Sequence, residues 1–262
     1  MTDPILLRDD ADHIATLTLN TPHNLNALSL AMITALQAEI TAIAQDGSVR
    51  VVILAGAGKV FCAGHNLKDI QGARSNADLG RGYFTTLFNA CAAMMQALQA
   101  LPQPVIAQVQ GIATAGGCQL AASCDLIVAA DTARFGVNGV NIGLFCSTPM
   151  VALTRKVPPA VAFEMLTTGA FISAARAHEV GLVNKVAAVD DLADETRALA
   201  ALIAAKLHAP VRIGKAAFYR QAGLSLKDAY AYTGQVMVDN MMLPDTDEGI
   251  AAFVEKRPPN WP

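Results

Sequence analysis

Charged residues are scarce in this 262-residue sequence: they make up 16% of it, against roughly 25% in an average soluble domain. Aromatic residues add only 5%, whereas hydrophobic residues as a group reach 53%. So little charge favours a large buried core and apolar contacts between subunits. The net charge is −3, and no run of lysine or arginine forms a basic stripe. Nucleic-acid binding therefore has no electrostatic support.

The sequence also lacks the usual marks of a membrane or secreted protein. No run of about 18 uninterrupted apolar residues is present, which argues against a transmembrane helix. Residues 1–10 turn acidic at once, unlike the basic and then apolar order of a signal peptide. We therefore expect a cytoplasmic protein that does not bind membranes.

Cysteine is present but in no pattern that forms a site. The five cysteines are odd in number, and no CxxC pair occurs among Cys62, Cys91, Cys118, Cys124 and Cys146. Neither a zinc site nor a disulfide framework is indicated, so we expect reduced thiols and no bound metal.

The hydrophobic pattern predicts strands alternating with helices, which is typical of an α/β fold with parallel crossovers. Strands are expected at residues 5–7, 13–20, 49–55, 105–110 and 126–130, and helices at 29–44 and 81–101. After residue 158 the pattern is almost wholly helical, apart from residues 182–186. We infer an α/β core over residues 1–199 and a helical region over residues 200–262.

Two glycine turns follow predicted strands. Gly64 permits a tight turn that leaves the N–H of His65 pointing into open space. Gly116 and Gly117 open a helix, whose first N–H groups suit developing negative charge. The plainer alternatives are an ordinary strand-to-helix connection at Gly64 and close helix packing at Gly116 and Gly117.

The segments around these turns resemble a known family. Phe61-Cys-Ala-Gly-His-Asn-Leu-Lys68 is similar to the family segment Phe-x-Ala-Gly-Ala-Asp-Leu/Ile-Lys. Residues 107–125 are similar to Ala-x-x-x-Gly-x-Ala-x-Gly-Gly-Gly-x-Glu-Leu-Ala-x-x-Cys-Asp. Both belong to the enoyl-CoA hydratase/isomerase family, the crotonases, and the likeness covers nearly the whole chain, including Asn26-Ala-Leu-Ser29.

The resemblance implies an α/β crotonase (ClpP-like) fold, with a β-β-α spiral core and a helical C-terminal region for trimerisation and CoA contact. It also implies an oxyanion hole for a thioester carbonyl, built from the main-chain N–H groups of His65 and Gly116. The substrate would be an acyl-CoA or enoyl-CoA, with no cofactor besides the CoA within it, and the protein a homotrimer or hexamer. The substrate-binding residues implied are Ala63, His65, Asn66, Leu67, Lys68, Gly116, Phe253 and Lys256.

Both glutamates that hold water in the family's hydratases are replaced. Gln119 stands at the first position and cannot exchange protons near neutral pH, and Gly139 stands at the second. Hydration is therefore doubtful, and glutamates introduced at both positions are expected to raise it. Isomerisation, decarboxylation or thioester hydrolysis stays open, as does an acyl-CoA binding protein without chemistry.

Other groups could supply the missing chemistry. Asn138, Asn141, Cys146 and Ser147 lie where other crotonases place reaction-specific residues, and a Cys146 thiolate could act as base or nucleophile. A buried, inert thiol is the plainer interpretation of Cys146, and a structural histidine that of the His65 imidazole. This stretch resembles the enoyl-CoA hydratase domain-containing protein 3 branch of the family.

Overall fold

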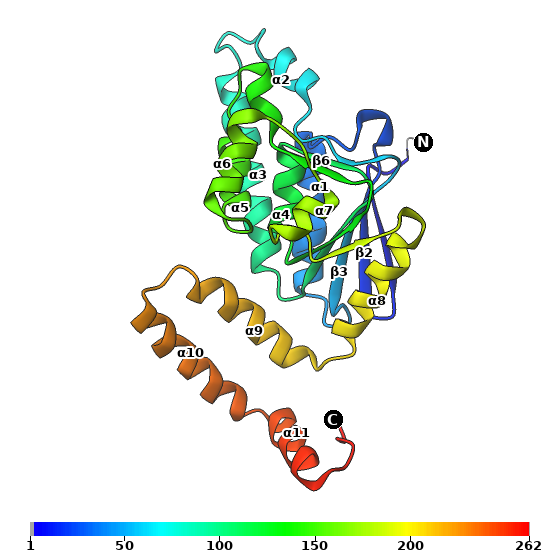
Figure 1. Ribbon diagram of the computed structural model, residues 1–262, viewed down its shortest axis with the longest axis vertical. Coiled ribbons are helices and arrows are strands. Elements are labelled where there is room, and N and C mark those ends of the chain that lie inside the picture. Colours follow the sequence, from blue (N-terminus) through cyan, green and yellow to red (C-terminus); the bar gives the residue numbers. More distant parts are fainter. Residues whose placement is uncertain (1–2, 262) are drawn as a thin grey trace. The chain divides into compact units, whose positions relative to one another are not determined.

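The computed structural model describes residues 3–261, which divide into two compact units, Met1–Lys206 and Leu207–Pro262 (Figure 1). The boundary expected at residues 199 and 200 falls inside helix α8 (Leu192–Ala204). This helix buries Leu192, Thr196, Ala200 and Ala204, which are four residues apart, and packs this face on the first unit's sheet. Helix α8 therefore belongs to the first unit, and the boundary between the two units lies after this helix.

The first unit is built on a six-stranded sheet with the order β1-β2-β3-β5-β7-β10. Strands β1 and β2 form an antiparallel hairpin, and the remaining neighbours pair in parallel. The inner strands are almost wholly buried, as expected of parallel strands covered on both faces. The strand bounds are β1 Leu6–Ala11, β2 Ile14–Leu19, β3 Val51–Gly56, β5 Val105–Val109, β7 Leu126–Ala130 and β10 Lys185–Ala187.

A second, four-stranded sheet has the order β4-β6-β8-β9. Its strands are β4 Val60–Cys62, β6 Ile112–Thr114, β8 Arg134–Gly136 and β9 Ile172–Ser173. The chain thus passes three times from a long strand to a short strand and then to a helix, which is the β-β-α spiral that the family resemblance implied. The sequence pattern missed all four of these strands, because runs of two or three residues cannot show a strand period.

The helices of the first unit lie around these sheets. Helix α1 begins where the side chain of Ser29 accepts a hydrogen bond from the N–H of Met32, so its predicted start is confirmed. The helix bounds are α1 Leu30–Ala44, α2 Leu67–Ala73, α3 Arg81–Ala100, α4 Gly116–Ser123, α5 Ser147–Leu153, α6 Pro159–Thr168 and α7 Ala174–Glu179. Short 3₁₀ turns occur at η1 Pro22–Asn24, η2 Asn138–Ile142 and η3 Val189–Asp191.

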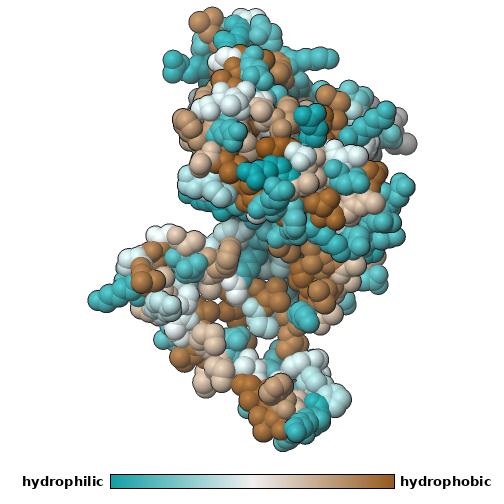
Figure 2. Space-filling view, viewed as in Figure 1, coloured by the Kyte–Doolittle hydropathy of each residue, from teal (hydrophilic) through white to brown (hydrophobic). Residues whose placement is uncertain are grey.

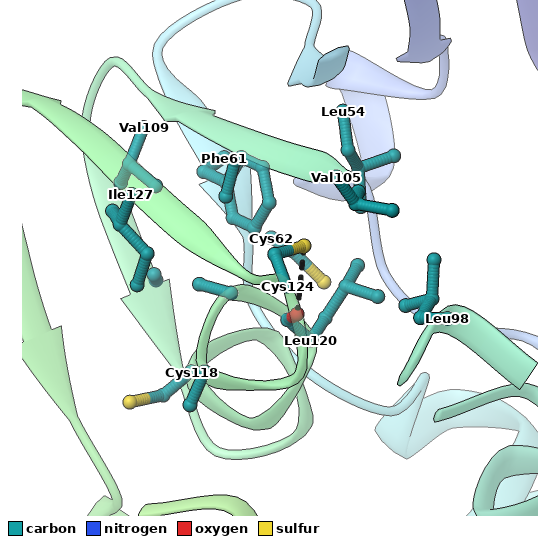
Figure 3. Packing of buried hydrophobic residues seen from close by; sticks show 14 of the residues in the cluster. Leu54, Phe61, Cys62, Leu98, Val105, Val109, Cys118, Leu120, Cys124 and Ile127 are labelled. Atoms are coloured by element: carbon teal, nitrogen blue, oxygen red, sulfur yellow. Dashed lines mark hydrogen bonds between the residues drawn. The ribbon is translucent and has the colours of Figure 1, made fainter. Parts of the chain in front are cut away.

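The core surrounds helix α4, all of whose residues are buried. Phe61 and Cys62 of β4 lie close to Leu120 of α4, and the Cys124 thiol donates a hydrogen bond to the Leu120 carbonyl at 3.4 Å (Figure 3). All five cysteines are buried and free. Helix α4 therefore has little freedom to move relative to β4.

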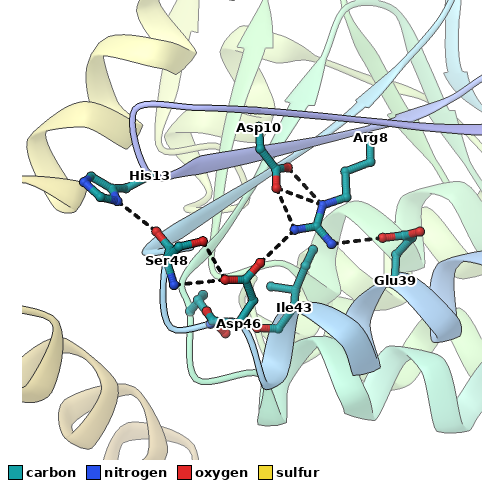
Figure 4. Close-up of polar contacts among 8 residues, drawn as sticks. Arg8, Asp10, His13, Glu39, Ile43, Asp46 and Ser48 are labelled. Atoms are coloured by element: carbon teal, nitrogen blue, oxygen red, sulfur yellow. Dashed lines mark hydrogen bonds and ion pairs between the residues drawn. The ribbon is translucent and has the colours of Figure 1, made fainter.

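A network of ion pairs connects the β1–β2 hairpin to helix α1. The Arg8 guanidinium lies 2.6 Å from Asp10, 3.3 Å from Glu39 and 3.1 Å from Asp46 (Figure 4). Its three carboxylate partners raise the pKa of Arg8, with the Asp10 hydrogen bond as the largest cause. Because these ion pairs connect β1 to helix α1 and to the turn after it, we assign them a structural role.

The second unit consists of α9 His208–Gln221, α10 Leu226–Met241 and α11 Pro244–Glu255. Large apolar side chains are exposed on it, and brown hydrophobic atoms are visible over it in Figure 2. They include Phe218, Leu226, Tyr230, Met237, Val238, Met241, Met242, Phe253 and Val254. Within residues 3–261, none of the helices combines the length and the apolar character that a membrane span requires.

Candidate active site

The first glycine turn lies directly after β4 and is fixed against the start of helix α1. Gly64 has φ +86°, a conformation that favours glycine, and its carbonyl accepts a hydrogen bond from the N–H of Leu28 at 2.7 Å. A Cβ at residue 64 would lie 2.9 Å from the main-chain nitrogen of Gly116. Gly64 is therefore required for the two turns to meet.

The second turn lies between β6 and helix α4, and its two glycines have different tasks. A Cβ on Gly117 would overlap the carbonyl oxygen of Cys62, so Gly117 permits close packing of α4 on β4. A Cβ on Gly116 would make only ordinary contacts, at 3.4 Å from Leu28 and from Gly64. The packing explanation thus applies to Gly117, and Gly116 is left as the residue at the meeting point.

Ala115, which precedes this pair, has φ +50° and ψ −119°, a region that favours glycine. It stands where the family segment has the first of three glycines. Its N–H donates to Gly136 at 2.9 Å, and its carbonyl accepts from Gln119 at 3.0 Å. These two bonds hold Ala115 in its strained conformation. The alanine at a position where the family segment has glycine is the sequence signal that could have revealed this strain.

Main-chain donors gather at this meeting point. Gln119 is the first residue of α4 whose N–H reaches a carbonyl one turn back. By helix geometry, the N–H groups of Gly116, Gly117 and Cys118 have no partner within the helix. The N–H of Gly116 lies against the Gly64 turn, beside residue 65. The structure therefore brings together the two residues, His65 and Gly116, that the sequence nominated as donors.

The His65 imidazole packs between the two turns and α3. Its Nδ1–H donates to the Leu28 carbonyl at 3.2 Å, and the edge of the ring meets Phe88 at a centroid distance of 5.3 Å. Nε2 is buried and has no hydrogen-bond partner among the described residues. Burial lowers the pKa of His65, and the Leu28 carbonyl opposes this shift. The ring is neutral at pH 7, with a lone pair on Nε2.

The remaining predicted ligands of the first turn lie at the start of α2. Asn66 caps this helix, because its side-chain oxygen accepts from the N–H of Lys68 at 3.0 Å. An aspartate would cap in the same way, which explains why Asn66 can replace the family residue. Leu67 and Lys68 are exposed, whereas Ala63 is half-buried and donates its N–H to Leu25.

The two positions that lack glutamate differ in the room they offer. Gln119 is 5% exposed, and its Oε1 has no hydrogen-bond partner within residues 3–261. A Cβ on Gly139 would overlap the carbonyl oxygen of Leu144 and lie 2.9 Å from Sγ of Cys146. A glutamate at residue 139 therefore requires the Leu144 carbonyl to move, and the expectation that glutamates at both positions raise hydration stays a prediction.

The nearby polar residues offer no ionised group. Asn138 accepts a hydrogen bond from the Thr114 hydroxyl at 2.7 Å, and Asn141 contacts Gly169. Burial raises the pKa of the Cys146 thiol, so it stays protonated at neutral pH. Ser147 is exposed at the start of α5. These contacts favour the structural interpretation of Cys146.

Two cavities are each lined in part by a residue already described at the site. One of about 420 Å³ is lined by Phe88, the ring partner of His65, together with Asp78, Leu79, Arg81, Phe84 and Thr85. The other, of about 340 Å³, is lined in part by Gln119. In the second unit, Phe253 lies on α11 and Lys256 at its end, and both are exposed. No group of three or more metal-binding side chains occurs within residues 3–261.

Comparison with known proteins agrees with this architecture. The sequence profile described as enoyl-CoA hydratase/isomerase matches residues 9–262. An enoyl-CoA hydratase domain-containing protein 3 from Xenopus laevis, named mitochondrial, is 48% identical over 98% of this chain and 86% of its own length. A crystal structure of an enoyl-CoA hydratase from Mycobacterium smegmatis is 52% identical, covers 99% of both chains and has a TM-score of 0.94.

The human enoyl-CoA hydratase domain-containing protein 3 has a crystal structure that is 44% identical. It covers 98% of this chain and 100% of its own, with a TM-score of 0.93. These relatives confirm the predicted branch and fold.

They also show that the predicted cytoplasmic location is wrong, because relatives matched over nearly the whole chain are named mitochondrial proteins. The acidic first residues argued only against a secretory signal, which does not distinguish the cytosol from other compartments inside the cell.

Proposed function

Since the chain belongs to the enoyl-CoA hydratase/isomerase family, we propose that it binds acyl-CoA thioesters and stabilises their enolates. The main-chain N–H groups of His65 and Gly116 hold the thioester oxygen. The observation that carries this proposal is the meeting of the turns, where only a glycine at residue 64 fits against the nitrogen of Gly116. Loss of one such donor typically costs about 2.7–4 kcal/mol of barrier.

The CoA part of the substrate is polyanionic and requires local cations in a protein of net charge −3. Lys68 suits this task, since its side chain is exposed at the start of α2 and is in no ion pair within residues 3–261. Ala63, Asn66 and Leu67 line the approach. Phe253 and Lys256 provide further contacts to CoA, from the same chain or from another copy.

The chemistry proposed is removal and return of a proton at the carbon next to the thioester. The C–H bond breaks, its electron pair moves into the enolate, and the negative charge develops on the oxygen held by the two N–H groups. The neutral imidazole of His65 can accept the proton at Nε2, whereas the Cys146 thiol stays protonated. The Gln119 amide can hydrogen-bond to polar groups of the substrate but does not exchange protons with them.

Proton exchange provides the direct test, because it requires an enolate but no hydration. We expect the protein to exchange the α-protons of butyryl-CoA for deuterium in D₂O, as followed by NMR. His65→Ala keeps the main-chain donor and should bind butyryl-CoA while exchanging at least about tenfold more slowly. Binding without exchange in the wild type would leave only the acyl-CoA binding role, which the missing carboxylates favour.

Absence of butyryl-CoA binding by calorimetry would reject both forms of the proposal. Free CoA and butyrate serve as controls, and each should bind more weakly than the thioester. Crotonyl-CoA hydration should be slow, since Gln119 and Gly139 supply no acid–base pair.

Assembly into a trimer, or a dimer of trimers, is part of the same proposal. The exposed apolar residues of the second unit support it, because a monomer rarely leaves so many large apolar side chains in water. Light scattering at micromolar concentration should give a mass of three or six chains. A monomer would contradict this part without affecting the oxyanion hole.

A further inference from the structure

A cavity of about 340 Å³ lies between helices α3, α4 and α5 of the first unit. Both apolar and polar side chains line this cavity. The lining residues are Ala92, Met95, Gln96, Gln99, Gln119, Ser123, Thr148, Val151, Ala152 and Arg155. Three amides, two hydroxyls and one guanidinium thus face a space that contains no carboxylate, so its polar character is neutral to positive.

Arg155 is the charged member of this lining. Arg155 is exposed just beyond the end of α5; its Nη1 donates to the Val151 carbonyl of that helix at 2.7 Å, and it takes part in no ion pair within residues 3–261. A guanidinium carries five N–H donors in a fork that matches a carboxylate. One bond to a carbonyl leaves most of these donors available to a ligand.

Gln119 connects this cavity to the proposed oxyanion hole. It lies three residues after Gly116 on α4, or about 4.5 Å further along the helix axis, and Ser123 lies about 6 Å beyond it. Gln119 is nine-tenths buried, and its Oε1 lacks a partner, although unpaired buried amides are rare. Gln119 therefore lies on α4 between Gly116 and the part of the cavity that Ser123 lines.

Resting on the proposed function, we infer that the acyl group of the substrate ends in a carboxylate. The methylene chain packs on Met95, Val151 and Ala152, and the terminal carboxylate binds Arg155. The amides of Gln96 and Gln99 provide further donors. The protein is then selective for dicarboxylic acyl-CoAs over monocarboxylic ones of equal length.

The test compares three probes by calorimetry: acetyl-CoA, hexanoyl-CoA and adipyl-CoA, the last two equal in chain length. We expect the wild type to bind adipyl-CoA about tenfold more tightly than hexanoyl-CoA, as a charge-assisted hydrogen bond suggests. Arg155→Met should abolish the preference, and Arg155→Lys should retain part of it. Arg176→Met, which alters an exposed arginine paired with Glu179 on α7, should leave it unchanged.

Hexanoyl-CoA bound as tightly as adipyl-CoA by the wild type would overturn the inference without any variant. The same holds if Arg155→Met keeps the adipyl preference. Acetyl-CoA is too short to reach Arg155 and separates the two proposals. If none of the three thioesters binds, the proposed function itself fails, whereas acetyl-CoA binding without adipyl preference rejects only the carboxylate.

Discussion

The two sides of the candidate site differ in what holds them. On one side, the Gly64 and Gly116 turns meet through main-chain atoms, and Gly64 and Gly117 leave no space for a side chain. On the other side, segment 138–147 contributes no ionised side chain. The backbone at Gly139 lies so close to Leu144 and Cys146 that a Cβ there would overlap them. Main-chain donors persist whatever side chain residue 65 carries, whereas acid–base chemistry disappears with the side chain that performs it. Under the proposed function, the site therefore retains charge stabilisation while it lacks the two glutamates of the hydratases.

Gly117→Ala should have the largest effect on the first side. Its Cβ would overlap the carbonyl of Cys62, and both β4 and α4 are buried, so neither can yield. We expect the free energy of unfolding to fall by about 3 kcal/mol or more. Denaturant unfolding would show this, with Gly116→Ala as the matched control that loses far less. Equal losses in the two variants would mean that α4 is not locked against β4.

Gly139→Ala tests the other side and should be less severe. The new Cβ would overlap the carbonyl of Leu144, but residues 140–145 are exposed and can shift. We expect a loss of about 1–2 kcal/mol in the free energy of unfolding. Gly47→Ala, which meets no atom within 4 Å, is the control. A stable Gly139→Glu variant with faster crotonyl-CoA hydration would refute the closed backbone at residue 139.

Asn66→Ala should remove the cap of α2 and cost about 1 kcal/mol. Asn66→Asp keeps an oxygen at the same place and should be neutral or slightly stabilising, because a carboxylate also favours a helix N-terminus. Thermal unfolding of the two variants against wild type measures the difference. If aspartate cost as much as alanine, Asn66 would have a role other than capping.

The pH dependence that arises from His65 is the smallest effect expected. Burial lowers its pKa below 6.5 in the folded state, so the unfolded chain takes up the proton first as the pH falls. Its contribution to stability is complete above about pH 6.5 and is lost as the pH falls through the folded-state pKa. Denaturant midpoints at about pH 7.5 and about pH 5.5 should therefore differ less in His65→Gln than in wild type. An identical difference would contradict a buried neutral imidazole.

Much of the fold was predictable because the long strands and helices have clear periods. Helix α1 and strands β2 and β7 appear where the pattern placed them. The meeting of the two glycine turns was also predictable, since motif and glycine spacing fix a backbone turn. The residues that orient the site were harder to find: Leu28 binds His65 and Gly64 from a distant part of the chain.

Contacts across space explain the rest. The sequence could not tell that Gly117 rather than Gly116 faces Cys62, because that depends on which way each Cα–H points. It could not show that residue 139 is closed, since Leu144 and Cys146 close it from the loop that follows. The location inside the cell was missed because a single excluded signal does not choose among the remaining compartments.

The strained conformation of Ala115 has a consequence for cooperativity. An alanine at φ +50° costs about 1–3 kcal/mol by itself, so the isolated loop would not adopt this geometry. Bonds to Gly136 and Gln119, which belong to β8 and α4, supply the difference. The donors therefore take their places only when the surrounding layers are assembled. A thioester that binds these donors binds only the folded state. The Tm should therefore rise as the thioester concentration is increased.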